Sequence, residues 1–135
     1  MASGDRELIE ALLDGDEARW KAAAALLGNE RTKHVQIMTF TNACFKQFPE
    51  DPSVDDVAAY VKRLREHHLP GADLKLVPTE FLIRGALGEP EVIRGISGDD
   101  MAAAHLVVIN AVANEHHLVG PPREEFISEV LDAID

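Results

Sequence analysis

Residues 97–120 read SGDDMAAAHLVVINAVANEHHLVG and form the most apolar and most clearly bounded stretch of this 135-residue sequence. Ser97 followed three residues later by Asp100 is typical of a capping box, in which the serine hydroxyl accepts a hydrogen bond from the backbone of the third helical residue. Gly120 followed by two prolines ends the pattern, because glycine adopts the left-handed cap and proline cannot continue a helix. The stretch predicts a helix over about residues 99–118.

Apolar side chains surround this predicted helix on all sides. At about 100° per residue, Met101 and Val108 lie on one face, and Leu106 and Val107 lie on the opposite face. A helix of this kind belongs in the middle of a domain. Polar residues interrupt it before about 18 apolar residues accumulate, so it is not expected to span a membrane. The sequence therefore predicts one all-α domain over residues 1–135, with six to seven helices packed around the central apolar helix.

Three polar residues of the central helix, His105, Asn110 and Asn114, need an explanation. His105 projects onto the same face as Met101, and Asn110 and Asn114 follow one another at a spacing of one helical turn. Each is predicted to be a core polar group that bonds to a backbone carbonyl or a buried water. The alternative is a small buried polar pocket lined by His105, Asn110 and Asn114.

The other helices are predicted from the same apolar spacing and from glycine and proline at their ends. Short connections between them are typical of antiparallel helical neighbours. We expect residues 72–77 to be a connector and residues 89–97 to form a short helix or 3₁₀ turn. The remaining expected helices cover about residues 4–14, 17–27, 30–48, 54–69, 78–87 and 121–135.

The helix expected over residues 30–48 carries the only cysteine, Cys44. Its apolar stripe is predicted to face the core and its polar side to face solvent. We interpret Cys44 as a small core hydrophobe and not as a nucleophile, because His34 would lie about 15 Å away along the helix. The predicted core stripe is Ile37, Met38, Thr41, Cys44, Phe45 and Phe48, and the predicted polar side is Gln36, Thr39, Asn42, Lys46 and Gln47.

Residues 53–88 and 97–135 share a sequence pattern, and each segment is predicted to form two helices. Both segments open with a serine cap and an Asp-Asp pair, and both first helices close with Glu-His-His-Leu. Each first helix is followed by a second helix that begins with proline and has an early Glu-Phe. The pattern fits a duplicated unit, and it also fits two helices that merely share boundary chemistry.

The two Glu-His-His stretches are the only concentrations of metal-type ligands in the sequence. If the two helix ends meet, their carboxylates and imidazoles would suit zinc or a similar ion. Adjacent helical residues point in different directions, however, and histidine is also favoured in a last turn by the helix dipole. His68 continues the apolar face of its helix, so we expect it to be buried and neutral or to lie at a subunit contact. We predict no bound metal or other cofactor, and the candidate ligands are Glu66, His67, His68, Glu115, His116 and His117.

Charge and cysteine content limit the function classes. The net charge of −11 opposes binding to nucleic acid or to an anionic membrane, because both carry negative charge. With one cysteine there is no intrachain disulfide, and the acidic N-terminus does not resemble a signal peptide, so a reducing cytoplasm is expected. The sequence contains no phosphate-binding loop, nucleophile elbow, CxxC motif or EF-hand loop.

These observations predict a soluble, acidic helical protein that works as a protein-interaction or regulatory module, as a homodimer or with a protein partner. No catalytic residue is assigned. One alternative is a small-ligand or metal-binding helical domain that uses the histidine pairs. A second alternative is an acidic protein of the immunity or decoy type that binds a basic partner, and it depends on charge alone. An enzyme whose site is assembled from distant residues stays open.

Overall fold

The computed structural model describes residues 3–67, 74–89 and 95–134, and within these ranges the chain forms seven α-helices and no strand. The predicted all-α fold class is therefore confirmed. None of the described helices combines the length and the apolarity needed to cross a membrane. The helices are α1 (Ser3–Asp14), α2 (Glu17–Leu27), α3 (Asn29–Gln47), α4 (Val54–His67), α5 (Leu76–Ala86), α6 (Gly98–Glu115) and α7 (Pro121–Ile134).

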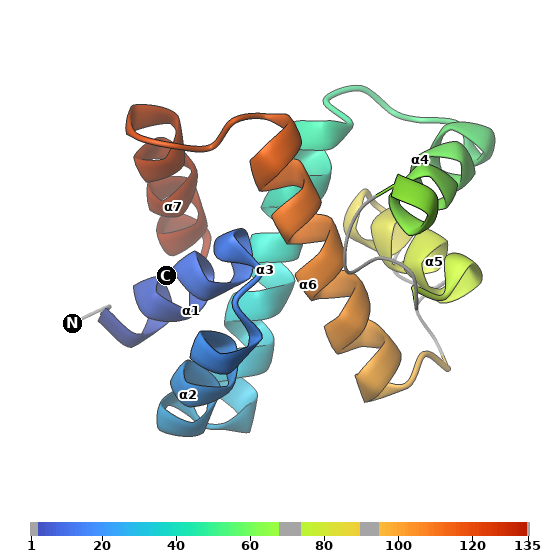
Figure 1. Cartoon of the computed structure of the whole chain (residues 1–135). Helices are drawn as coiled ribbons and strands as arrows, with labels where there is room; N and C mark the ends of the chain where they lie inside the picture. The colour runs from blue at the N-terminus through green and yellow to red at the C-terminus, as the bar shows by residue number, and fades with distance from the viewer. Residues whose placement is uncertain (1–2, 68–73, 90–94, 135) are drawn as a thin grey trace.

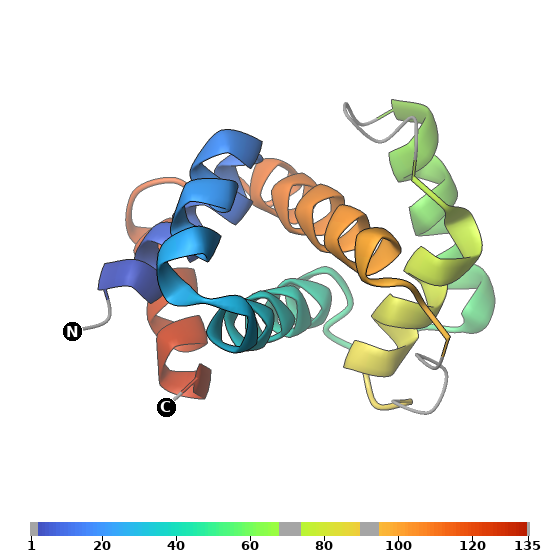
Figure 2. The same cartoon turned by 90° about the horizontal axis from the view of Figure 1, so that it is seen from below.

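The helices are arranged in three layers (Figure 1). α3 and α6 lie in the middle, α1, α2 and α7 pack on one side of them, and α4 and α5 pack on the other, as Figure 2 shows from below. α6 contacts α1, α3, α4 and α5, while α3 contacts α1, α2, α5, α6 and α7. The core is therefore organised around two middle helices that share the central position expected for α6 alone.

α6 is buried nearly all round, as its sequence predicts. The Ser97 hydroxyl accepts a hydrogen bond from the Asp100 amide at 3.1 Å, which confirms the predicted start. The predicted end near residue 118 was too late. The helix ends at Glu115 because His117 adopts a left-handed conformation with φ 51°, and the Leu118 amide then bonds back to the Ala113 carbonyl. The buried residues are Ala104, His105, Val107, Val108, Ile109, Asn110, Ala111, Val112 and Ala113.

The predicted orientation of α3 was wrong in part, although Met38 and Phe48 pack against the core as expected. Ile37 and Phe45, which were expected in the core, are 40% and 52% exposed. Gln36 and Thr39, which were expected to face solvent, are buried. Cys44 is buried as predicted. The face that α3 buries consists of Thr32, Val35, Gln36, Thr39, Phe40, Ala43 and Cys44.

Polar side chains on α3 can be buried because they have hydrogen-bond partners. The Thr39 hydroxyl donates to the Val35 carbonyl at 2.7 Å. The side-chain carbonyl of Gln36 accepts from the Trp20 indole N–H at 2.9 Å. A polar group that is hydrogen-bonded pays little for burial. The neighbours of α3, rather than its own apolar spacing, therefore decide which face it turns inward.

The turn between α1 and α2 is fixed by Gly15 and Asn110. Gly15 adopts φ 64°, and a Cβ atom at this position would lie 2.9 Å from Cγ of Asn110. Asn110 on α6 donates from Nδ2 to the Leu13 carbonyl at 2.8 Å. This carbonyl belongs to the last turn of α1, where backbone acceptors have no partner within the helix. Asn110 therefore ties α6 to the end of α1, and glycine at position 15 permits the close approach.

The two segments that echo one another in sequence begin alike and pack differently. The Ser53 hydroxyl accepts from the Asp56 amide at 3.0 Å, so both predicted capping boxes are confirmed. α4 lies against α5, whereas α7 lies mainly against α3 and α1. Duplication therefore stays a prediction. His68 lies outside the described residues, and so do parts of the expected connector at 72–77 and of the expected turn at 89–97.

Replacement of Asn110 by alanine is expected to lower the free energy of unfolding by about 1–3 kcal/mol, because the Leu13 carbonyl would stay buried without a partner. Asn114→Ala is the matched control, since Asn114 lies one turn further along α6, is exposed, and contacts Asn110 at 3.4 Å. Chemical denaturation measures both variants. Equal destabilisation by the two substitutions would contradict the role assigned to Asn110.

Candidate functional site

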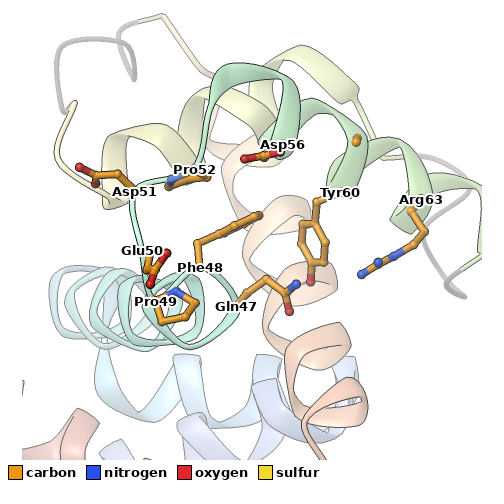
Figure 3. Close-up of a pocket in the computed structure, with 10 residues that line it drawn as sticks. Gln47, Phe48, Pro49, Glu50, Asp51, Pro52, Asp56, Tyr60 and Arg63 are labelled. Atoms are coloured by element: carbon orange, nitrogen blue, oxygen red, sulfur yellow. The ribbon is translucent and has the colours of Figure 1, made fainter.

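A surface pocket lies where α3 ends and α4 begins (Figure 3). Its volume is about 600 Å³, within the range of roughly 300–1,000 Å³ that is typical of small-ligand sites. We call it the corner pocket. The residues that line it are Gln47, Phe48, Pro49, Glu50, Asp51, Pro52, Asp56, Ala59, Tyr60 and Arg63.

The chain turns at this corner for reasons that are local in sequence. The Phe48 amide closes α3 by bonding to the Cys44 carbonyl at 2.8 Å. Pro49 and Pro52 follow, and proline neither donates a backbone hydrogen bond nor continues a helix. Ser53 then starts α4 through its capping box. The result is a short, stiff connection that holds residues from both helices around the pocket.

Two aromatic rings form one wall of the corner pocket. Phe48 and Tyr60 meet edge to face, with ring centroids 5.4 Å apart and an interplanar angle of 83°, which is a favourable arrangement of two rings. Arg63 places its guanidinium carbon 5.0 Å from the centre of the Tyr60 ring. The same guanidinium pairs with the Glu115 carboxylate at the end of α6, at 2.7 Å. The pocket wall therefore also joins α4 to α6.

The Tyr60 hydroxyl is the one buried side-chain polar atom of the described residues that lacks a hydrogen-bond partner. Tyr60 is 5% exposed, and Figure 3 shows its ring directed from α4 toward Gln47 and the end of α3. Burial, and after it the charge of Glu115, raise the pKa of Tyr60 above its ordinary value, so the hydroxyl keeps its proton. A buried donor without a partner costs about 1–3 kcal/mol. Because the hydroxyl is buried, a group bound in the pocket would reach it only if neighbouring side chains moved.

Carboxylates border the corner pocket. Glu50, Asp51 and Asp56 line it, and Asp55 is exposed on the first turn of α4. Asp56 accepts from the Ser53 amide at 3.1 Å in the capping box. Within the part of the chain that the structure describes, none of these four carboxylates forms an ion pair. We call these four residues the acidic corner.

The end of α6 brings one of the two predicted histidine stretches next to the corner pocket. Glu115 pairs with Arg63, and Nε2 of His116 lies 2.9 Å from the side-chain oxygen of Gln47. An amide oxygen accepts hydrogen bonds, so the imidazole is the donor in this contact. Arg63 and Gln47 both line the pocket. Two sequence candidates, Glu115 and His116, therefore support its wall.

The other metal candidates that have a described position, Glu66, His67 and His117, are exposed. His67 is exposed, and its Nε2 lies 3.7 Å from the carboxylate of the adjacent Glu66. His117 is exposed at the end of α6. Among the residues with a described position, no group of three or more histidine, cysteine, aspartate or glutamate side chains could hold a metal ion. His68 is not among these residues, so its burial stays a prediction.

His105 lies in different surroundings from Asn110 and Asn114, and the Asn114 amide donates to the side-chain oxygen of Asn110 at 3.4 Å. His105 faces α3, where its ring centroid lies 4.6 Å from that of Phe40. Asn110 faces the end of α1 through its bond to the Leu13 carbonyl. Asn114 is exposed. The structure does not bring the three side chains together around one space.

Sequence reasoning gave the residues of the corner pocket a purely structural role. Phe48 was expected in the core stripe of the helix over residues 30–48, and the residues that follow it were assigned no site. The Phe-Pro-x-x-Pro turn followed by a capping box is a usable signal, because a stiff corner leaves residues that neither helix covers. The pairing of Arg63 with Glu115 has no such signal, since the two residues are 52 positions apart.

Comparison with known proteins identifies no relative of this chain. No protein-family model, no curated protein and no solved structure matches the chain significantly. The fold and the corner pocket therefore define the protein as an all-α chain in three layers, with an aromatic and charged pocket between α3 and α4.

Burial holds His105 in its neutral form, and a chain of hydrogen bonds fixes which ring nitrogen accepts. The Trp20 indole N–H can only donate, so it fixes the side-chain oxygen of Gln36 toward itself. The amide nitrogen of Gln36 then faces Nδ1 of His105 at 3.4 Å, where the imidazole must accept. Burial lowers the pKa of His105 to about 4.

Acidification is expected to destabilise the protein through His105. Between pH 6.5 and about 4 the unfolded chain binds a proton that folded His105 excludes, so stability is lost as the pH falls. Across this window the wild type should lose about 3 kcal/mol more than a His105→Gln variant, which cannot titrate. Denaturant titrations at several pH values measure the difference, and an unchanged gap between the two proteins would contradict it.

Cys44 is expected to be unreactive in the folded protein. The thiol is buried, and burial raises its pKa well above the ordinary value, so almost no thiolate is present at neutral pH. A thiol reagent should label no cysteine in the native protein and one per chain in denaturant. Rapid labelling under native conditions would show that the end of α3 opens.

Proposed function

We propose that this protein is a non-enzymatic interaction module and that the corner pocket is its partner-binding site. The observation that carries the proposal is the pocket wall, in which the buried, unpartnered Tyr60 hydroxyl lies beside the Phe48 ring and the Arg63 guanidinium. Aromatic and arginine side chains supply most of the binding energy at protein interfaces. The chain has five phenylalanines, one tyrosine and one tryptophan, and its only tyrosine and one phenylalanine line this pocket.

The composition of the pocket supports recognition more than catalysis. The described lining holds carboxylates, one guanidinium, one amide and one phenol, with no histidine, cysteine or serine to serve as a nucleophile with its base. The only cysteine in the chain, Cys44, is buried with a raised pKa, which makes it a poor nucleophile. Binding requires nothing beyond the shape, the rings and the charges already present.

A different protein fits this site better than a second copy of the chain. The chain has a net charge of −11, and two copies that met at the acidic corner would repel one another. A metal ion is a weaker candidate, because the histidines near the end of α6 contact Gln47 or solvent. The proposal therefore assigns the pocket to a separate partner protein.

Ala59→Arg is expected to abolish partner binding, because Ala59 is exposed and lines the corner pocket, which the longer side chain would fill. Arginine has nearly the helix propensity of alanine, so α4 should fold normally. The tagged chain is used to capture proteins from the cells in which it occurs, and the captured proteins are quantified by mass spectrometry. The variant should retain at least about tenfold less of the specific partner.

Ala25→Arg is the matched control for this experiment. Ala25 is exposed on α2, in the layer on the other side of α3 and α6, and the substitution adds the same charge and volume. This variant should retain the partner at the wild-type level. The proposal fails if the wild type retains no protein specifically, or if both variants lose the captured protein equally.

A further inference from the structure

We infer that the partner of the corner pocket presents an extended basic segment with an apolar side chain that packs against Phe48 and Tyr60. This inference rests on the proposed function and specifies the chemistry of the partner. It combines four features of the molecule: uncompensated charge at the acidic corner, the pocket wall, a guanidinium already bound there, and a second pocket beside the first.

Unpaired negative charge is densest at the corner. On the layer formed by α1, α2 and α7, several acidic side chains pair with arginines, and the exposed Glu125, Glu129 and Asp132 of α7 form no ion pair in the described structure. Those pairs are Arg6 with Glu10 and Glu124, Arg19 with Glu7 and Asp14, and Arg123 with Asp14. The acidic corner, by contrast, places four carboxylates within seven consecutive residues, 50–56, without an ion pair in the described structure. A basic segment would supply the missing charges.

The pocket wall already binds a guanidinium from within the chain. Arg63 lies over the Tyr60 ring and pairs with Glu115, which combines a cation–π contact with an ion pair. Arg63 thus already occupies this face of the Tyr60 ring. The basic side chains of the bound segment are therefore assigned to the acidic corner, and its apolar side chain to the aromatic wall.

A second pocket continues the first on the other side of the loop. Its volume is about 370 Å³, and it shares Asp51 and Pro52 with the corner pocket. Val54, at the start of α4, is 55% exposed in this pocket, and Arg84 of α5 is paired with Glu89. The remaining lining is Ser53, Val54, Arg84, Leu87, Gly88 and Glu89. Two small pockets on either side of one loop suit an extended segment that crosses the loop better than a helix or a folded domain.

Binding of synthetic peptides to the full chain tests this inference. The probes are fluorescently labelled Lys-Arg-Phe-Lys-Arg, Lys-Arg-Gly-Lys-Arg, which lacks the apolar side chain, and Glu-Asp-Phe-Glu-Asp, which reverses the charge. We expect the first peptide to bind about fivefold or more tightly than the second, and the third to show no binding. Binding of the first should weaken as the salt concentration rises. Amide shifts in nuclear magnetic resonance spectra should concentrate on residues 47–63.

Two double variants with equal charge change locate the binding site. Glu50→Gln with Asp51→Asn removes two charges of the acidic corner and leaves both partners of the capping box intact. Glu129→Gln with Asp132→Asn removes from α7, in the layer on the other side of α3 and α6, two exposed charges that form no ion pair in the described structure. The corner variant should weaken binding of Lys-Arg-Phe-Lys-Arg about fivefold, and the control variant less than about twofold. Thermal unfolding of each variant confirms that it is folded.

The outcomes separate this inference from the proposed function. Equal weakening by the two double variants, or amide shifts spread over the whole surface, would show non-specific attraction between charges and would overturn the inference. Preference for the acidic peptide would overturn it as well. If the Ala59→Arg variant still loses its partner while the basic peptide shows no preference for the corner, the pocket is an interaction site for a partner of different chemistry.

Discussion

The polar groups buried between the middle helices and the first layer need hydrogen-bond partners, and this requirement fixes how those helices meet. Trp20, Gln36 and His105 form a chain of contacts that runs from α2 through α3 to α6. Asn110 on α6 caps the end of α1 through the Leu13 carbonyl. Apolar contacts alone would allow these helices to slide or rotate, whereas directional bonds specify one arrangement. The position of α3, and with it the corner where α3 ends, follows from these bonds.

Charge pairs extend the same arrangement to the outer helices. Asp5 is buried and pairs with Arg31, which joins α1 to α3, and breaking such a pair leaves a charge without compensation. On the opposite side, Arg63 of α4 pairs with Glu115 of α6. These arginines are committed to structural partners. The same distribution of charge leaves the carboxylates of the acidic corner without an ion pair in the part of the chain that the structure describes.

The parts of the fold that the sequence predicts are those whose signals are local. Leu8 and Leu12 on α1 and Val57 on α4 lie in stripes with helical spacing and are buried as expected. The serine caps of α4 and α6 are likewise set by residues three positions apart. Part of the orientation of α3 was predicted wrongly because its buried face depends on atoms that other helices supply. Gln36 reads as a surface residue until Trp20 and His105 are placed beside it.

The candidate site was harder to predict than the fold, for a related reason. A pocket forms where no side chain fills the space between two elements. The spacing of apolar residues in a sequence predicts which side chains pack and does not predict where such a space remains. Once the structure is known, hydrogen bonding indicates the site. The buried polar side-chain atoms of the described chain all have a hydrogen-bond partner except the Tyr60 hydroxyl. That exception lies beside the joint between α4 and α6, where Arg63 contacts both the Tyr60 ring and Glu115. A partner that engages Tyr60 or Arg63 would therefore act on the attachment of α4 as well as on the pocket, since the same side chains form both.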